Sequence, residues 1–371
     1  MATEKNRSDP SYNTFLAPLR RIWRSISIPL TAIFLALLIG AVILALSDAN
    51  PLDAYAALLK GAFGNANNFG RTLEKATPLI LGGLAVAFAF KAGLFNIGGQ
   101  GQLVFGAIFA AYLGFSLNGL PFPLHMLIAL LGGSLIGGLY AAIPGALKTY
   151  TGAHEVITTI MLNFVALNTT DYLANGPWKD TTDIVAKTPP ILDSAAIPRL
   201  GNIPIGFFIA ILAAVLTWYL LYRTTIGFEI RTVGLNPHAA KYAGIKVART
   251  IILAMIISGS MAGMGGAIET LGVVGRYQPG FNAGLGFDGI TIALLAQTNP
   301  LGVVPAALLV GAMQAGSSQM QFDAKVPSQI IDVIQALILF FVSADAIVRW
   351  ILRSRRTDGE KVTLSTGWGK G

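Results

Sequence analysis

The octapeptide FNIGGQGQ, residues 95–102, stands between two long apolar stretches of the chain. The stretch LILGGLAVAFAF precedes it at residues 79–90, and LVFGAIFAAYLGF follows it at residues 103–115. Both belong to runs near the length that crosses a lipid bilayer as a helix, about 20 residues. Because glycine permits sharp backbone turns, the octapeptide predicts a break between two membrane helices. Its amide side chains can bond the backbone groups that such a break leaves without partners.

The composition of the whole chain is that of a membrane protein. Of its 371 residues, 54% are hydrophobic and 12% are charged, about half the charged fraction of a typical soluble domain. The formal net charge is +8. In a membrane protein such an excess lies at the cytoplasmic helix ends, so we expect membrane lipid as a partner and no nucleic acid. The chain has no cysteine, which excludes disulfides and thiolate chemistry.

The apolar runs predict an all-α, polytopic membrane protein with about ten transmembrane helices in a single domain over residues 1–371. The expected spans lie at about residues 29–46, 76–93, 98–117, 124–147, 155–174, 204–222, 250–271, 287–298, 301–320 and 328–348. The eighth is short and is interpreted as a half-helix or a re-entrant segment. Pro144, Pro305 and the glycine pairs 132–133 and 137–138 are expected to interrupt helical runs. Glycines spaced four residues apart should let helix backbones approach closely.

The positive charges predict the orientation of the chain. With a cytoplasmic N-terminus, 18 of the 26 lysines and arginines fall inside and the remaining 8 fall outside. Because cytoplasmic segments carry the basic excess, both termini are predicted to be cytoplasmic. Residues 1–28 then form a cytoplasmic N-terminal segment, residues 223–249 a long cytoplasmic loop, and residues 349–371 a cytoplasmic tail.

The pattern of the octapeptide occurs a second time. The sequence FNIG at residues 95–98 recurs as FNAG at residues 281–284, and Gln102 corresponds to Asp288 at the same offset (288 − 102 = 186). The topology derived from charge places the two copies at opposite ends of the membrane. We therefore predict an inverted repeat of five spans plus five, as many transporters have. A chance match in a glycine-rich chain is the alternative.

Polar residues at the two breaks are candidates for the lining of a substrate pathway. Irregular backbone at membrane depth is stable only inside protein or beside a water-filled cavity. We predict that Asn96, Gln100 and Gln102 of the first break lie near a central cavity or its gates. Asn282 and Asp288 of the second break are predicted to lie near the same cavity. The alternative for each side chain is that it only holds its turn.

Motifs of catalysis and of cofactor binding are absent from the sequence. It has no GxxxxGK[ST] phosphate-binding loop, so the chain is expected to be no enzyme and to lack an ATPase site. Its three histidines have no metal-ligand spacing, and no metal is expected. Glu269, Asp288 and Asp332 are acids within predicted spans. Such acids could bind a coupling ion or could bond to backbone at broken helices.

The long cytoplasmic loop contains RTVGLNPHAAKYAGI at residues 231–245, which has the punctuation of a short helix. Asn236 can cap the N-terminus, Pro237 suits the first helical position, and Gly244 suits the position past the end.

The composition of this short helix suits a protein contact. Small side chains at Ala239, Ala240 and Ala243 would let it approach another protein closely, and Tyr242 could anchor the contact. An ordinary connector lying on the lipid headgroups is the alternative.

These motifs resemble the permease subunits of ATP-binding-cassette importers. The likeness is to the family that handles ribose-type sugars, branched-chain amino acids and nucleosides, and it extends over spans two to ten. FNIGGQGQ is similar to the family's asparagine–glycine signature, although Gln100 stands where the nucleoside branch commonly has glutamate. GAHEVITTIMLNFVA at residues 152–166 and GPWKD at residues 176–180 also resemble the nucleoside branch.

The resemblance implies a nucleoside permease in the bacterial plasma membrane that binds no cofactor itself. ATP would be used by a partner ATPase subunit. The other implied partners are a second permease, homologous to this chain in the usual pairing of the branch, and an extracellular substrate-binding lipoprotein. The positions that match the family's ATPase-coupling motif are Gly234, Asn236, Ala239, Ala240, Tyr242 and Gly244.

Other classes of function stay open on the sequence alone. Sugar and branched-chain amino acid permeases share the same scaffold. A secondary transporter would use the same repeat and would bind a coupling ion at Glu269, Asp288 or Asp332. A membrane scaffold protein would need no central path, and the many glycine breaks disfavour it.

Overall fold

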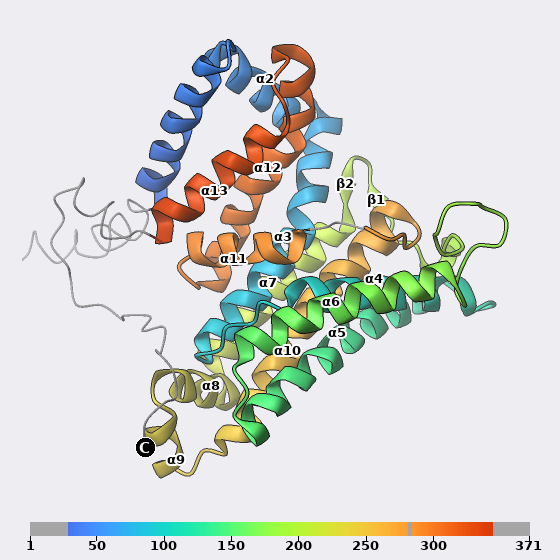
Figure 1. Cartoon of the computed structure of the whole chain (residues 1–371). Coiled ribbons are helices and arrows are strands. Elements are labelled where there is room, and N and C mark those ends of the chain that lie inside the picture. Colours follow the sequence, from blue (N-terminus) through green and yellow to red (C-terminus); the bar gives the residue numbers. More distant parts are fainter. Residues whose placement is uncertain (1–28, 281–283, 344–371) are drawn as a thin grey trace, which may run out of the picture.

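The computed structural model describes residues 29–280 and 284–343, and these are mostly helical (Figure 1). Asn282, the expected N-terminal segment 1–28 and the expected tail 349–371 lie outside the described residues. The helices are Pro29–Leu46, α2 Pro51–Phe63, α3 Ala66–Lys91, α4 Gly99–Ser116, α5 Leu124–Thr151, α6 Glu155–Asn175, α7 Ile205–Arg223, α8 Thr225–Leu235, α9 Pro237–Tyr242, α10 Val247–Glu269, α11 Leu285–Leu295, α12 Pro300–Ala324 and α13 Gln329–Ser343.

Short elements complete the described chain. A π-helical turn, Thr270–Val274, continues α10, and a 3-10 turn occupies Asp193–Ala195. The strands β1 Arg199–Leu200 and β2 Ile203–Pro204 form a small antiparallel hairpin before α7. Arg199 pairs with Pro204, and Leu200 pairs with Ile203.

Six of the described helices are long and apolar enough to cross a membrane. They are Pro29–Leu46, α3, α5, α7, α10 with its π-turn, and α12. The apolar helices α11 and α13 are shorter. Helices α4 and α6 have 18 and 21 residues, but glutamines in α4 and a series of asparagines and threonines in α6 lower their mean hydropathy. The chain is therefore a multi-pass helical membrane protein.

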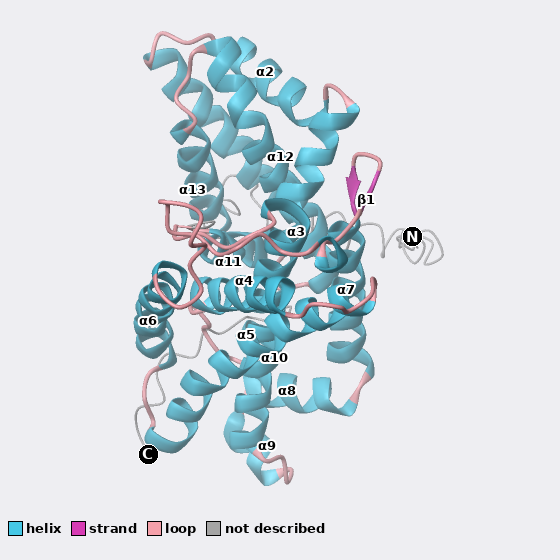
Figure 2. Ribbon diagram, turned by 90° about the vertical axis from the view of Figure 1, so that its right-hand side faces the viewer, coloured by secondary structure: helices cyan, strands magenta, loops and turns pink. Residues whose placement is uncertain are grey.

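Helix α3 lies at the centre of the molecule (Figures 1 and 2). In its most apolar segment, 89% of the residues are buried, whereas the share is 22% in the peripheral helix Pro29–Leu46. It packs against α7, α10, α11 and α12. Figure 2 shows α2 at one end of the molecule and α8 and α9 at the other.

Helices α5 and α10 pack together through glycines, as their four-residue spacing predicted. A Cβ built on Gly137 would lie 2.7 Å from the Cα of Gly263 and 2.7 Å from the carbonyl oxygen of Gly259. No side chain larger than hydrogen fits at that distance, so glycine allows the two backbones to touch. The packing of these helices depends on these positions.

Several expected boundaries were wrong. Helix α5 continues without interruption through its glycine pairs and Pro144, and α12 continues through Pro305. The glycines are helical because they serve interhelical contact, and a proline costs one backbone hydrogen bond that packing can offset. Helix α3 begins at Ala66, ten residues before the expected start of the second span, and α2 occupies part of the expected connection. The expected loop 223–249 consists mainly of α8 and α9.

Candidate functional site

The octapeptide forms the predicted break between α3 and α4. Helix α3 ends at Lys91 and α4 begins at Gly99, with seven non-α-helical residues between them. Gly93 in this connection has a φ of +71°, a left-handed conformation that glycine adopts without a Cβ clash. The break therefore lies where the sequence placed it.

A hydrogen-bonded network of buried side chains holds the break. The Nδ2 of Asn96 donates to the Oε1 of Gln102 at 2.9 Å, and the Nε2 of Gln102 donates to the Oδ1 of Asn96 at 3.0 Å. The Nδ2 of Asn96 also donates to the Oγ of Ser258 in α10 at 2.9 Å. The Oγ of Ser258 in turn donates to the carbonyl oxygen of Ala85 in α3 at 2.7 Å. The network joins α3, the break, α4 and α10.

A residue of α6 caps the first turn of α4. The Oδ1 of Asn163 accepts a hydrogen bond from the backbone nitrogen of Gly101 at 2.8 Å, and its Nδ2 donates to the carbonyl oxygen of Ile97 at 3.0 Å. Sequence reasoning missed both Asn163 and Ser258. An asparagine within an apolar run was the available signal for Asn163, because a membrane helix rarely carries an amide without a partner.

The first break contacts the start of α11. The backbone nitrogen of Gly286 donates to the Oε1 of Gln100 at 2.9 Å, and a Cβ on Gly286 would collide with the backbone of Gln100. These two residues are 186 positions apart, the offset of the sequence repeat. The start of α4 and the start of α11 therefore lie side by side in the fold.

The predicted pathway residues are largely enclosed in this structure. Asn96, Gln100 and Gln102 are only 1–2% exposed, and their hydrogen bonds hold the turn. The Oδ2 of Asp288 is half-buried and accepts a hydrogen bond from the Nε2 of Gln314 in α12 at 3.0 Å. A role in a pathway stays a prediction for these residues.

The three candidate acids lie in different surroundings. Glu269, at the end of α10, is 4% exposed, whereas Asp332 on α13 is exposed. Among residues 29–280 and 284–343, no group of three His, Cys, Asp or Glu side chains forms an arrangement that could hold a metal ion.

The predicted short helix is α9, and its caps are those expected from the sequence. The Oδ1 of Asn236 accepts a hydrogen bond from the backbone nitrogen of Ala239 at 3.0 Å, and Pro237 occupies the first turn. Gly244 follows the helix with a φ of +83°. The side chain of Tyr242 is 94% exposed, so it is free to contact another molecule.

Comparison with known proteins assigns the chain to a family. Residues 68–343 match the family described as "Branched-chain amino acid transport system / permease component". The chain belongs to this permease family. The match covers the described chain from residue 68 onward and includes the break, α8 and α9.

Three characterised relatives are similar to this permease over most of its length. The guanosine ABC transporter permease protein NupP of Bacillus subtilis is 41% identical, and the match covers 90% of this chain and 97% of the length of NupP. The nucleoside ABC transporter permease protein NupB of Lactococcus lactis is 35% identical, over 89% and 93%. The glucose ABC transporter permease protein TsgB13 of Haloferax volcanii is 32% identical, over 88% and 90%.

The short helix of the permease has one alanine turned inward. Ala240 is fully buried and packs with Ile230 and Val233 of α8 and with Ile251 of α10. The expectation that Ala240 lies on a docking face was therefore wrong, because the helix uses this residue to attach to its own chain. Ala239 and Ala243 remain exposed.

Gly234 connects α8 to the chain just before the break. A Cβ on Gly234 would collide with the carbonyl oxygen of Lys91, and it would lie 2.9 Å from the carbonyl carbon of Ala92 and 2.9 Å from the nitrogen of Gly93. Only glycine permits this backbone contact. The permease thus joins α8 and α9 to the connection between α3 and α4.

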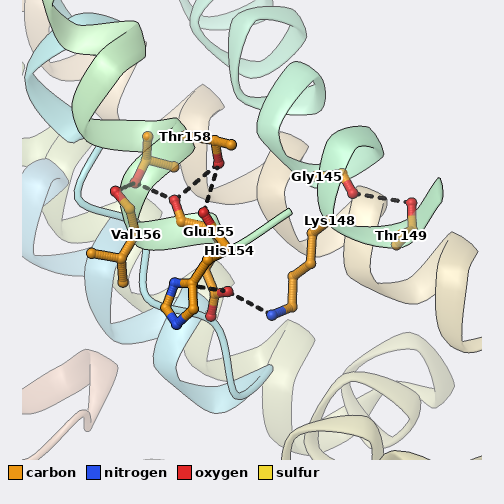
Figure 3. Close-up of polar contacts among 8 residues, drawn as sticks. Gly145, Lys148, Thr149, His154, Glu155, Val156 and Thr158 are labelled. Atoms are coloured by element: carbon orange, nitrogen blue, oxygen red, sulfur yellow. Dashed lines mark hydrogen bonds and ion pairs between the residues drawn. The ribbon is translucent and has the colours of Figure 1, made fainter. Parts of the chain in front are cut away.

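A buried ion pair fixes the turn between α5 and α6 (Figure 3). The Nζ of Lys148 lies 2.6 Å from the Oε2 of Glu155, and both side chains are 12% exposed. The Nδ1 of His154 lies 3.9 Å from the same oxygen. Glu155 begins α6, where the helix dipole favours a negative charge. The motif that resembles the nucleoside branch thus has a structural role in this turn.

Proposed function

We propose that this permease is the membrane-spanning subunit of an ATP-driven importer whose substrate is a nucleoside. The observation that carries the substrate class is the similarity to NupP and NupB over 90% and 89% of this chain. A sugar is the second candidate, because TsgB13 is similar over 88% of the chain. The scaffold is shared by all three relatives, so the substrate has to be distinguished by transport.

The proposed architecture has ten membrane helices in an inverted repeat of five plus five, within one domain. The six long helices, together with α4, α6, α11 and α13, make up ten candidates (6 + 4 = 10). The contact between Gln100 and Gly286, at the repeat offset, supports a symmetric meeting of the two halves. The basic excess supports cytoplasmic termini in a bacterial plasma membrane.

Helices α8 and α9 are the proposed contact with an ATPase subunit. The proposal assigns ATP hydrolysis to that partner and no cofactor to this chain. Tyr242 and Ala239 are exposed on a capped helix at one end of the molecule, which suits insertion into a groove. Gly234, Asn236 and Gly244 would shape this element, and Ala240 would fasten it to the protein.

The same packing supplies a route from the ATPase contact to the pathway. Ala240 belongs to one apolar cluster with Ala92 and Leu94, which lie just before the octapeptide. A displacement of α9 would therefore act on the break through directly packed atoms, because close-packed interiors transmit displacement. The buried amides Asn96, Gln100 and Gln102 would exchange partners when the path opens.

The remaining proposed partners are a second permease and an extracellular substrate-binding lipoprotein. An importer needs a closed path between two permease chains, and a binding protein would deliver the substrate to the outer face. Release of the substrate into the path requires that the membrane domain bind it weakly. Weak binding fits side chains such as Asn96 and Gln102, which hydrogen-bond to each other in the enclosed state.

Reconstituted transport tests the function. The permease would be co-expressed with candidate ATPase, second-permease and lipoprotein subunits from the same genome and placed in vesicles. Labelled guanosine, uridine, glucose and leucine would then be offered with and without ATP. ATP-dependent uptake of a nucleoside is expected. Uptake of glucose alone would select the sugar importer, and uptake driven by an ion gradient without ATP would refute the assignment.

A further inference from the structure

Helix α8 has a buried face and a polar face. Gly227, Ile230 and Val233 are buried against the protein. Thr225 and Glu229, four residues apart on another side of the helix, are exposed. Figure 2 shows α8 turned across the end of α7, so the helix does not continue the direction of the preceding span. This placement is typical of a helix at a membrane boundary.

The third face of α8 is apolar apart from one arginine. Phe228 and Leu235 are 59% and 70% exposed. Arg231 lies between them in sequence, three residues after Phe228 and four before Leu235, so the three side chains share one side of the helix. Exposed apolar side chains on one side of a boundary helix are suited to contact with lipid acyl chains.

Two arginines adjoin two aromatic rings beside this face. The Cζ of Arg231 lies 5.1 Å from the ring centre of Tyr222, and the Cζ of Arg223 lies 5.7 Å from the ring of Trp218. The two ring centres are 6.2 Å apart. Tryptophan and tyrosine near the end of a span mark the level of the lipid headgroups.

The two guanidinium groups lack an anionic partner within the described part of the chain. Neither Arg223 nor Arg231 forms an ion pair there, and the Nε of Arg231 is buried without a hydrogen-bond partner. A ring face satisfies the charge of a guanidinium in part but accepts none of its in-plane N–H groups well. A phosphate oxygen would accept them in the geometry that arginine prefers.

We propose that these residues form a binding site for a phospholipid with an anionic headgroup. In this α8 lipid site, Arg223 and Arg231 hold the phosphate and Phe228 and Leu235 contact the acyl chains. The neighbouring side of α7 supports a lipid as the occupant, because Leu212, Leu216 and Tyr219 are 57%, 56% and 55% exposed there. Tyr219 is four residues before Arg223, so these apolar side chains lie on the side of α7 that carries the arginine.

Lipid retention by the full chain tests the site. The permease would be purified in detergent, incubated with phosphatidylglycerol or phosphatidylcholine, and analysed by native mass spectrometry. Wild type should retain phosphatidylglycerol preferentially, and R223Q/R231Q should retain about thirtyfold less, because each of the two basic residues near a membrane surface contributes about 1 kcal/mol to binding anionic lipid. The matched control R71Q/K75Q removes two exposed charges from the first turns of α3 and should retain the lipid.

Additional variants and competitors show whether lipid retention depends on these two arginines. R223K/R231K keeps both positive charges but loses the planar guanidinium groups that donate paired hydrogen bonds. Intermediate retention of phosphatidylglycerol is expected. This variant replaces R223Q/R231Q if the glutamine variant does not fold. Equal retention in wild type and both arginine variants would overturn the site. So would an equal loss in R71Q/K75Q, or displacement of the whole lipid by inorganic phosphate. Loss of ATPase association with unchanged lipid retention would assign this face to a protein contact instead.

Discussion

Asn163 shows how one side chain stabilises a break in a membrane helix. It is 4% exposed. Its side chain accepts a hydrogen bond from the backbone N–H of Gly101 and donates one to the carbonyl oxygen of Ile97. At the start of a helix the first backbone N–H groups have no intrahelical partner. An amide from α6 takes over this task for α4, and it joins two helices that the sequence separates by some 60 residues.

Replacing Asn163 by alanine should lower stability. The change leaves the buried N–H of Gly101 and the part-buried carbonyl of Ile97 without their side-chain partner, which costs about 1–3 kcal/mol. The midpoint of thermal unfolding of the detergent-solubilised permease measures the effect. Asn168→Ala is the matched control, because Asn168 is exposed on the same helix and its side chain donates to the carbonyl of Phe164 in the preceding turn. Equal midpoints for the two variants would contradict the capping role.

Asp183 should make the stability of the loop at residues 176–198 depend on pH. Its hydrogen bond with Lys187, and then that with the backbone of Val185, lower the pKa of Asp183 below its usual 3.8. Because the folded-state pKa is depressed, its contribution is present above about pH 4 and is lost as the pH falls through the folded-state value. Hydrogen exchange of this loop should be faster in Asp183→Asn than in wild type at pH 7, and the difference should shrink as the pH falls below about 4. A variant effect that persists unchanged at low pH would disprove this.

The helix pair α8–α9 has separate surfaces for attachment and for contact. Ala240, Ile230 and Val233 attach it to the protein, whereas Tyr242 is almost fully exposed. A short helix has little stability of its own, so the cluster and the Asn236 cap fix its position. Substitutions on the two surfaces should therefore have different effects.

Tyr242→Ser should weaken association with the ATPase without changing the thermal midpoint of the permease. Loss of an aromatic anchor at an interface costs about 2 kcal/mol or more, a roughly thirtyfold loss of affinity. Co-purification of the two subunits measures it. Tyr172→Ser removes a tyrosine that is 70% exposed on α6 and should leave association intact. Unchanged co-purification in the Tyr242 variant would remove α9 from the contact.

Gly234→Ala should uncouple ATP hydrolysis from transport. The added methyl group would push α8 away from Lys91 and Gly93, and overpacking of this kind costs about 1–3 kcal/mol. ATPase association should persist because Tyr242 stays exposed, while nucleoside uptake per ATP falls. Gly272→Ala is the control, since its nearest neighbour would be at an ordinary 3.5 Å. Normal uptake per ATP in Gly234→Ala would show that the contact between α8 and the connection after α3 does not couple ATP hydrolysis to transport.

At the scale of the whole molecule, different helices lie at the two ends. One end carries α8 and α9, and the other carries α2 (Figure 2). The connection between α6 and α7 holds Trp178, which packs against Tyr112 and Phe109 of α4 with ring centres 4.4 and 5.3 Å apart. An ordered connection of this length is suited to form a fixed outer surface.

Cysteine labelling should confirm the orientation. The chain has no cysteine of its own, so single cysteines at Ile184 and His238 report without background. Ile184 is 96% exposed, and position 184 should react with an impermeant reagent added to intact cells. Position 238 should react only after permeabilisation. The reverse pattern would overturn the proposed topology.

Local features of the sequence determined much of this fold. Hydrophobic length indicated the membrane helices, glycines with amides indicated the break after α3, and Asn236, Pro237 and Gly244 defined α9. The physical reason is that helix length, capping and turn formation depend on residues within a few positions of one another. The spacing of Gly137 and Gly263 with their neighbours likewise indicated close helix packing.

The tertiary structure alone decided which partners these local elements meet. Asn96 bonds to Ser258, 162 positions away, and Ala240 is turned inward although α9 by itself gives no sign of this. Helix α5 passes through Pro144 because interhelical packing outweighs the local cost of proline. Contacts between distant segments depend on the shape and packing of the whole chain, and no short window of sequence contains that information.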